Sequence, residues 1–384
     1  MKYFLLILCI FLLFCGCSAS DDVIPTVVDT ELIVSTAPTI HTETIPAETT
    51  PPDPIRELMN SMSLEERVGQ LFLARCDDSV ALKHIETYHL GGFVLFSRDF
   101  ENQTPASLSE KLISYQSAAK LPLLIAVDEE GGTVNRVSSN PSFRNQKFNS
   151  PRNLYAGGGM DWVLSEENEK CGLLTSLGIN VNLGPVCDIT TDPNAFMYQR
   201  SLGQDAATTS QYTAQVISVM NAYRLGSCLK HFPGYGNNID THTGIAVDSR
   251  PLEELECNDL LPFTAGIEAG CGAILVSHTI LEALDPQLPA SLSPAVHQYL
   301  RNTMAFSGVI ITDDLVMQAI TDAYGAGEAA VLAVLAGNDL LCSTEYMVQY
   351  DAVLAAVLSG RIDIDTLNSA VRNVLEWKTQ LGLL

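Results

Sequence analysis

The sequence predicts an α/β fold, a single TIM-type (β/α)8 barrel, over residues 54–384. Two observations support this prediction. Eight short apolar runs lie between residues 69 and 344, and most are near-continuous rather than alternating, as in strands buried on both faces. Longer amphipathic stretches separate these runs, and buried strands that alternate with helices over this length are typical of a closed barrel.

The expected strands lie in the runs 69–75, 91–98, 122–132, 179–189, 226–236, 272–279, 308–315 and 338–344. Helical spacing covers 106–119, 161–177, 205–224, 252–268 and 345–359, and 363–382 is the expected final helix. An early helix begins after Ser63, because Ser63 and Glu66 have the spacing of a capping box. We expect no second domain after the eighth strand.

Residues 1–17, MKYFLLILCIFLLFCGC, are typical of a lipoprotein signal segment. The apolar run 3–15 is shorter than the roughly 20 residues that span a bilayer. Gly16 precedes Cys17 as in a lipobox, so we expect lipid on Cys17; an ordinary secretory signal is the alternative. The Thr- and Pro-rich residues 18–53 are expected to form a disordered tether. The protein is thus predicted to be extracytoplasmic, either anchored to the cell membrane or released.

Composition excludes some functions. A formal net charge of −24 argues against nucleic-acid binding, which requires a basic face. No CxxC pair occurs among the cysteines beyond the signal segment, which argues against a zinc ribbon or a disulfide scaffold. We expect no metal, no organic cofactor and a monomer.

Polar residues follow nearly every expected strand at its C-terminal end, where the catalytic groups of TIM barrels lie. They are Arg75, Arg98, Asp128, Asp188, Lys230, His231, His278 and Asp313. So many on one rim predict a polar pocket.

The stretch LKHFPGYGNNIDTHTG, residues 229–244, carries two further candidates. Lys230 and His231 are consecutive at a strand end, so only one needs to face the barrel axis unless a bulge turns both inward. Asp240 and His242 are two residues apart and share one side of an extended segment. A carboxylate bonded to the imidazole raises its pKa and suits it for general-acid work. A turn histidine, or half of a metal site with His231, remains an alternative.

Three other motifs carry candidates. In GVIITDDLVM, Asp313 is interpreted as a nucleophile or electrostatic stabiliser. Asp314 is expected to cap the following helix or to support the residues of the site. In DEEGGTVNRV, adjacent acids that begin at Asp128 suit sugar hydroxyls, with a calcium site as the alternative. QRSLG supplies Arg200 in a loop after the fourth strand.

Together, KHFPGYGNNIDTH, DEEGG, NLGPVCDI, QRSLG, SHT with the later LDPQLPASLS, and ITDDLVM resemble glycoside hydrolase family 3, in its β-N-acetylglucosaminidase branch. The likeness covers residues 55–384. It implies a (β/α)8 barrel that removes terminal N-acetylglucosamine (GlcNAc) with retention of configuration, often from peptidoglycan fragments such as muropeptides. The β-glucosidase branch commonly takes its acid from a second domain, which is not expected here.

The resemblance also implies residue roles. Asp313 matches the nucleophile that forms the glycosyl-enzyme, His242 the general acid/base, and Asp240 its partner. Positions that hold the sugar's hydroxyls match Asp128, Arg200, Lys230 and His231, and His278 matches a position near the site.

The chain departs from the family pattern at three positions. Tyr235 replaces a histidine, Glu129 a glutamine and Thr241 a serine. The first two are expected to alter the subsite beyond the cleaved sugar, so a muropeptide preference is less secure than GlcNAc removal.

The leading hypothesis is therefore an exo-β-N-acetylglucosaminidase (β-N-acetylhexosaminidase). A glycoside phosphorylase on the same site is the second, because a histidine that has lost its proton is uncharged and tolerates phosphate. A β-glucosidase or β-xylosidase, and a non-catalytic sugar-binding lipoprotein, are the remaining alternatives.

Overall fold

The computed structural model describes residues 53–384 except 191, 237 and 239–243. Cys17, residues 18–52 of the predicted tether, Thr241 and the predicted pair Asp240 and His242 lie outside the described residues.

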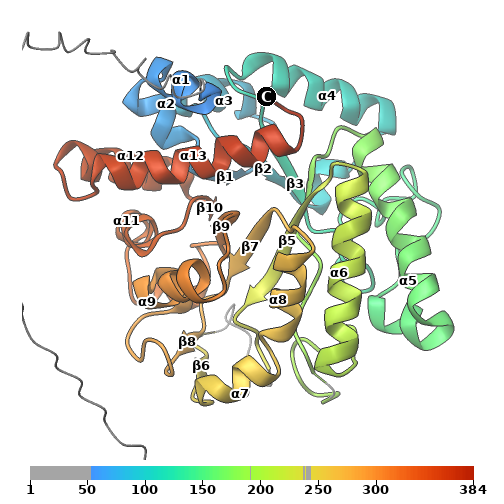
Figure 1. Ribbon diagram of the computed structural model, residues 1–384. Helices are drawn as coiled ribbons and strands as arrows, with labels where there is room; N and C mark the ends of the chain where they lie inside the picture. Colours follow the sequence, from blue (N-terminus) through green and yellow to red (C-terminus); the bar gives the residue numbers. More distant parts are fainter. Residues whose placement is uncertain (1–52, 191, 237, 239–243) are drawn as a thin grey trace, which may run out of the picture. The chain divides into compact units, whose positions relative to one another are not determined.

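Eight parallel strands form one sheet in the order β10-β1-β2-β3-β4-β5-β7-β9. A parallel bridge between Ile311 and Leu340 brings β9 beside the start of β10, so the sheet nearly closes into a barrel (Figure 1). Each strand lies in a predicted run, which confirms the (β/α)8 prediction. The strands are β1 (Phe72–Arg75), β2 (Gly92–Leu95), β3 (Leu124–Val127), β4 (Val181–Asn182), β5 (Gly226–Phe232), β7 (Ala273–Val276), β9 (Val309–Thr312) and β10 (Leu341–Ser343).

Helices surround the barrel (Figure 1). They are α1 (Pro54–Ser61), α2 (Leu64–Gly69), α3 (Ala81–Tyr88), α4 (Pro105–Ala118), α5 (Pro151–Ser176), α6 (Ala206–Ala222), α7 (Leu252–Cys257), α8 (Leu261–Glu268), α9 (Pro294–Gln298), α10 (Gln318–Thr321), α11 (Ala326–Ala336), α12 (Tyr346–Leu358) and α13 (Ile364–Gln380). Strands β6 (Val247–Asp248) and β8 (Ile280–Leu281) form a separate pair, and single turns lie at Ser97–Phe100, Ala290–Leu292 and Tyr299–Thr303. None of the described helices is both long enough and apolar enough to cross a membrane.

Some element boundaries were predicted wrongly. The expected helix 252–268 is two helices, because Asn258 leaves the helical region with φ −137° and ψ −80°. Helix α5 begins at Pro151 rather than at 161, and glycines 158 and 159 interrupt it. Helix α11 was not predicted, because its sequence, AGEAAVLAVLA, is apolar on nearly all sides of the helix and shows no amphipathic period. The predicted capping box is confirmed: Ser63 Oγ accepts from Glu66 N at 3.2 Å, and Ser63 N donates to the Glu66 carboxylate at 2.9 Å.

Helix α13 closes the N-terminal end of the barrel. The buried indole of Trp377 packs with the inward residues of the strands. Beneath β7 the approach is so close that a β-carbon on Gly272 would lie 2.1 Å from Trp377 Nε1, so this position requires glycine. The barrel is therefore open to ligands at its other, C-terminal end.

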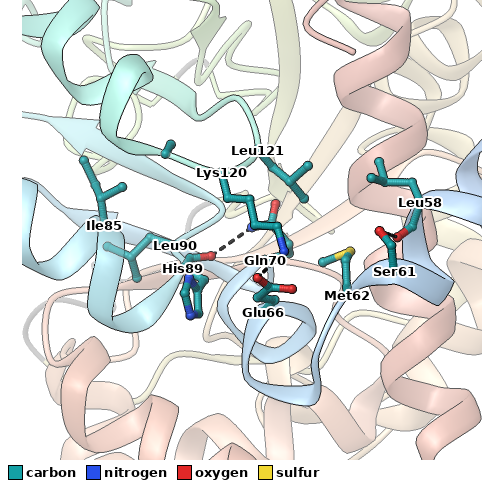
Figure 2. Close-up of a pocket in the computed structure, with 11 residues that line it drawn as sticks. Leu58, Ser61, Met62, Glu66, Gln70, Ile85, His89, Leu90, Lys120 and Leu121 are labelled. Atoms are coloured by element: carbon teal, nitrogen blue, oxygen red, sulfur yellow. Dashed lines mark hydrogen bonds and ion pairs between the residues drawn. The ribbon is translucent and has the colours of Figure 1, made fainter.

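A small hollow also lies at the N-terminal end, between α2 and the loops that precede β2 and β3 (Figure 2). Lys120 pairs with Glu66 at 2.6 Å on its wall, and Gln70 Nε2 donates to the carbonyl of His89 at 2.8 Å. Its volume of about 20 Å³ suits a water molecule, not a sugar.

Lys378 lies fully buried on α13, and its Nζ donates to Gln70 Oε1 at 2.7 Å. No carboxylate among the described residues forms a salt bridge with it. Burial therefore lowers the pKa of Lys378 to about 7, whereas an unfolded lysine has a pKa of about 10.4. Between these values the unfolded chain binds a proton that the folded chain lacks.

The free energy of unfolding should consequently rise with pH from about 7 to about 10, because the unfolded state binds more protons in this window. Lys378→Met should remove this rise in the free energy of unfolding, which amounts to at most about 5 kcal/mol across the window. Urea denaturation of both proteins near either end of the window measures the two slopes. Equal slopes would show that Lys378 is protonated in the folded protein.

Candidate active site

A cavity of about 710 Å³ opens at the C-terminal ends of the strands, where the polar pocket was predicted. Residues at the C-terminal ends of β1 and β5, or directly after β2, β3 and β9, contribute to its wall: Arg75, Phe96, Asp128, Lys230, His231 and Asp313. Arg200 from the loop after β4 also lines it. The barrel thus brings together predicted residues that are as far apart in the chain as Arg75 and Asp313.

Both Lys230 and His231 reach the cavity, although they are consecutive residues. The pairing of β5 with β7 shifts register between Leu229 and Phe232. This irregularity is the bulge that the sequence left open as one of two arrangements.

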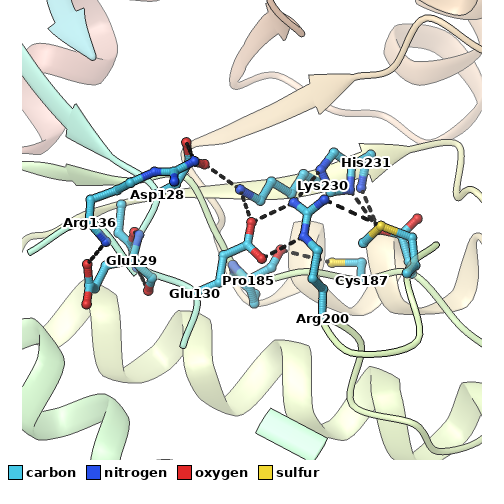
Figure 3. A network of polar contacts seen from close by, with 12 residues as sticks. Asp128, Glu129, Glu130, Arg136, Pro185, Cys187, Arg200, Lys230 and His231 are labelled. Atoms are coloured by element: carbon cyan, nitrogen blue, oxygen red, sulfur yellow. Dashed lines mark hydrogen bonds and ion pairs between the residues drawn. The ribbon is translucent and has the colours of Figure 1, made fainter. Parts of the chain in front are cut away.

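A network of charges occupies one wall (Figure 3). Lys230 Nζ lies 2.6 Å from Asp128 Oδ1 and 2.7 Å from Glu130 Oε1. Arg200 holds the same Glu130 carboxylate with two bonds, from Nε at 2.9 Å and from Nη2 at 2.7 Å. Such bidentate pairing fixes the guanidinium and the carboxylate relative to each other. Two cations and two carboxylates therefore form a balanced cluster at the rim of the barrel.

The network keeps its charges at neutral pH. Burial alone would raise the pKa of Glu130, but the charges of Arg200 and Lys230 outweigh it and hold this pKa well below its ordinary value. Burial works against the ammonium of Lys230, yet Asp128 and Glu130 raise its pKa overall. These groups can therefore bind hydroxyls as fixed ionic donors and acceptors.

His231 sits between an acceptor and a donor. Its Nδ1 lies 2.8 Å from Asp188 Oδ2, and its Nε2 lies 3.1 Å from Arg200 Nη2. A guanidinium nitrogen only donates, so Nε2 must accept, and Nδ1 must carry the proton and donate a hydrogen bond to the Asp188 carboxylate. In this arrangement His231 is a neutral imidazole with both ring nitrogens engaged by the protein.

Asp188 also organises the loop after β5. Its carboxylate accepts from the backbone N of His231 at 3.2 Å and of Tyr235 at 2.7 Å. Tyr235 itself lies on the cavity wall and packs edge-on against Phe196, with ring centroids 5.6 Å apart. Tyr235 thus lines the cavity with a side chain that is only 1% exposed, and its expected effect on the subsite beyond the cleaved sugar stays a prediction.

Asp313 follows β9 directly and lines the cavity. Its backbone N donates to the carbonyl of Val276 at 3.0 Å, and its Oδ1 accepts from Asp314 N at 2.9 Å. Asp314 turns to the neighbouring loop, where its carboxylate accepts from the hydroxyl and the backbone N of Thr344. This is the supporting role expected of Asp314.

His278 is fully buried and is not among the described residues that line the cavity. Its Nε2 lies 3.0 Å from the carbonyl oxygen of Asp314, and its Nδ1 lies 2.7 Å from Ser291 Oγ. Through these bonds it supports the backbone beside Asp313. Direct contact between His278 and a sugar stays a prediction.

Glu129 is not among the described residues that line the cavity, and its expected effect on the subsite stays a prediction. The side chain is fully buried. Its Oε2 accepts from the backbone N of Arg136 and of Val137, both at 2.7 Å. Its Oε1 accepts from both the backbone N and the hydroxyl of Ser138. Donors surround both oxygens, which explains why a carboxylate stands here.

Sequence reasoning missed Glu130. It paired Asp128 with its immediate neighbour Glu129, but successive residues of an extended segment point to opposite sides. The i, i+2 spacing of Asp128 and Glu130 was the signal that could have found it. Arg136 is a second missed residue: it lines the cavity, and its Nη2 lies 3.8 Å from Asp128 Oδ2.

The chain is similar to known proteins over most of the described residues. The Glycosyl hydrolase family 3 N terminal domain matches residues 63–377. The β-hexosaminidase of Nitrosomonas eutropha is 32% identical over 291 residues, which cover 71% of this chain and 81% of that protein. The β-hexosaminidase of Xanthomonas campestris pv. campestris is 32% identical over 302 residues, which cover 76% and 87%.

Solved structures show the same relationship. The family 3 β-N-acetylglucosaminidase from Paenibacillus sp. superposes with a TM-score of 0.79 and 32% identity, over 84% of this chain and 63% of that one. This chain thus spans less than two thirds of the Paenibacillus chain. The β-N-acetylhexosaminidase from Beutenbergia cavernae gives a TM-score of 0.73 and 27% identity, over 83% of this chain and 99% of that one. The chain belongs to glycosyl hydrolase family 3 and is a glycosidase.

Proposed function

We propose that the protein is a retaining exo-β-N-acetylglucosaminidase (β-N-acetylhexosaminidase) that acts through a covalent glycosyl–Asp313 intermediate. One observation carries the proposal: Asp313 shares a cavity with the ionised cluster of Asp128, Lys230, Glu130 and Arg200. Fixed carboxylates and cations of this kind bind vicinal hydroxyls of one sugar ring. The barrel core closes the cavity from below, which favours a terminal sugar over the middle of a chain.

In the proposed reaction, an Asp313 oxygen attacks the anomeric carbon while the bond to the leaving oxygen breaks. His242, held by Asp240, gives its proton to the leaving oxygen. In the second step His242 takes a proton from water, the water oxygen attacks the anomeric carbon, and Asp313 leaves as a carboxylate. The roles of His242 and Asp240 rest on the sequence motif alone.

Two arginines support a cell-wall substrate. The guanidinium carbons of Arg75 and Arg136 lie 4.5 and 5.5 Å from the centroid of the Phe96 ring, on the wall of the cavity. In a chain of net charge −24, two such cations beside the sugar cluster suit an anionic neighbour of the cleaved sugar. The lactyl carboxylate of muramic acid in peptidoglycan fragments has this chemistry.

The proposed location follows from the N-terminal segment. We propose that lipid on Cys17 holds the enzyme at the outer side of the cell membrane, close to such fragments. Membrane fractionation of cells that produce Cys17→Ala tests this, and unchanged retention would contradict it.

A panel of aryl glycosides tests the activity. We expect hydrolysis of the β-GlcNAc glycoside at least about tenfold faster than of the β-glucoside or β-xyloside, because buried groups that pair with one substituent reject substrates lacking it. Proton NMR of the first product should show the β-anomer. Phosphate-dependent release of a sugar 1-phosphate would instead show a phosphorylase, and no turnover would favour a non-catalytic binding protein.

The same panel extends to the aglycone. A GlcNAc–muramic acid disaccharide should be preferred over the neutral GlcNAc dimer, and Arg75→Met should raise its KM by about tenfold, the loss of one charge-assisted contact. Arg98→Met is the matched control, because Arg98 follows β2, donates to the carbonyl of Cys76 and does not line the cavity. Equal KM values for Arg75→Met and the parent would overturn the assignment of this arginine.

A further inference from the structure

Helix α5 carries an exposed tryptophan outside the catalytic cavity. The chain has two tryptophans. Trp377 is 3% exposed inside the barrel core, whereas Trp162 is 56% exposed on α5. Tryptophan is enriched where proteins make contacts, because its ring offers a large apolar face together with one polar N–H group.

The indole of Trp162 packs against the backbone at the break in α5. A β-carbon on Gly158 would lie 2.1–2.3 Å from Cδ2, Cγ and Cδ1 of Trp162, and one on Gly157 would lie 2.8 Å from Cζ3. Atoms of both rings of the indole therefore lie over consecutive glycines, and only residues without a β-carbon permit this approach. Gly159 follows with φ +65°. The indole is held against backbone on one side while much of its surface stays open.

A groove of about 430 Å³ adjoins the ring. Its polar wall contains Asn149, Asn153, Ser165, Glu166 and Glu169. Glu166 Oε2 accepts from Asn149 Nδ2 at 3.1 Å, and its other oxygen accepts from Asn149 N.

The remaining charge in the groove is paired. Glu169 is held by Arg144 through bonds of 2.8 and 3.0 Å. The groove thus combines one flat aromatic surface with amides, a hydroxyl and carboxylates in fixed positions.

This chemistry fits a neutral sugar chain. An aromatic face packs on the apolar C–H face of a sugar ring, and the surrounding oxygens and amides bind its hydroxyls. The acidic lining and the net charge of −24 disfavour an anionic lipid surface.

The loop between β3 and α5 supplies residues to both the groove and the catalytic cavity. A β-carbon on Gly131, next to Glu130 in the cavity, would lie 2.1 Å from the carbonyl oxygen of Asn149 in the groove. The backbone N of Gly132 also donates to the carbonyl of Phe148 at 2.8 Å. Ligand in the groove would therefore contact the segment that positions Glu130.

We propose that the Trp162 groove is a second sugar-binding site, which holds a neutral stretch of a β-linked GlcNAc chain away from the cleaved end. The choice of GlcNAc rests on the proposed function. The site itself does not take part in bond cleavage.

Tryptophan fluorescence tests the groove, because Trp162 is the exposed one of the two tryptophans. The probe is the β-1,4-linked GlcNAc hexamer, added to an Asp313→Asn variant so that it is not hydrolysed. We expect the hexamer to shift the emission, and Trp162→Ala in the same background to weaken hexamer binding by about tenfold in calorimetry. In the active enzyme, Trp162→Ala should lower kcat/KM for the hexamer but not for a short aryl β-GlcNAc.

Two further variants serve as comparisons. Gly158→Ala should displace the indole and weaken hexamer binding while Trp162 remains present. Tyr223→Ala removes another exposed aromatic, which is 38% exposed beyond α6 and outside the groove, and should leave binding unchanged.

Unchanged hexamer affinity in Trp162→Ala, with no shift in emission of the parent, would overturn the second site. If the aryl glycoside is still hydrolysed in that case, the proposed function stands. If hexamer binding depends on Trp162 but the active enzyme does not hydrolyse the aryl glycoside, the second site stands and the proposed function fails.

Discussion

Replacing Asp313 by alanine is expected to lower kcat/KM for an aryl β-GlcNAc by about 10⁴-fold, the scale on which loss of a covalent nucleophile acts. The expectation rests on the position of Asp313 at the end of β9, in the same cavity as the sugar-binding cluster. Its backbone is held by Val276, so the loss should be chemical rather than structural.

Azide provides a sharper measurement for Asp313→Ala. The space left by the carboxylate should admit azide, which attacks the anomeric carbon and expels the aryl alcohol to give an α-glycosyl azide. Asp322→Ala, at the exposed end of α10, is the matched control and should keep the parent's rate. Full activity of Asp313→Ala without azide would remove Asp313 from the mechanism.

Glu130→Gln is expected to lower both stability and activity. The neutral amide leaves Lys230 and Arg200 buried with one carboxylate fewer, and breaking a buried ion pair costs about 3–5 kcal/mol. Hydroxyl contacts that depend on the cluster are misplaced as well, and kcat/KM should fall by about 10²-fold. Chemical denaturation and aryl-glycoside kinetics measure the two effects.

The pH dependence of the free energy of unfolding separates the loss of an ion pair in Glu130→Gln from a general packing defect. Because the pKa of Glu130 is lower in the folded protein, its contribution is present above the unfolded value of about 4.3 and is lost as the pH falls toward the folded value. The stability gap between the parent and Glu130→Gln should therefore narrow below about pH 4. Glu110→Gln, exposed on α4, should show no gap. A gap that is constant with pH would contradict an ionic role.

The barrel was predictable because its strands are buried on both faces. Runs such as PLLIAVDEEGG and GVIITDDL carry apolar side chains on consecutive residues, as strands covered on both faces do. The polar residues that end these runs were predictable for the same reason, since parallel strands place their C-terminal ends on one rim. Helix α11 was not predictable, because a helix covered on nearly all sides has no amphipathic period.

By itself, the sequence determined the strand order along the chain and which polar residues stand at the strand ends, because both depend on local patterns. Tertiary structure alone decided how those residues are used. The register shift at β5 lets both Lys230 and His231 line the same cavity. Arg200 sets the tautomer of His231. Glu130 joins Arg200, from the loop after β4, to Lys230 on β5. Such decisions rest on contacts between segments far apart in the chain, and no local pattern encodes their geometry.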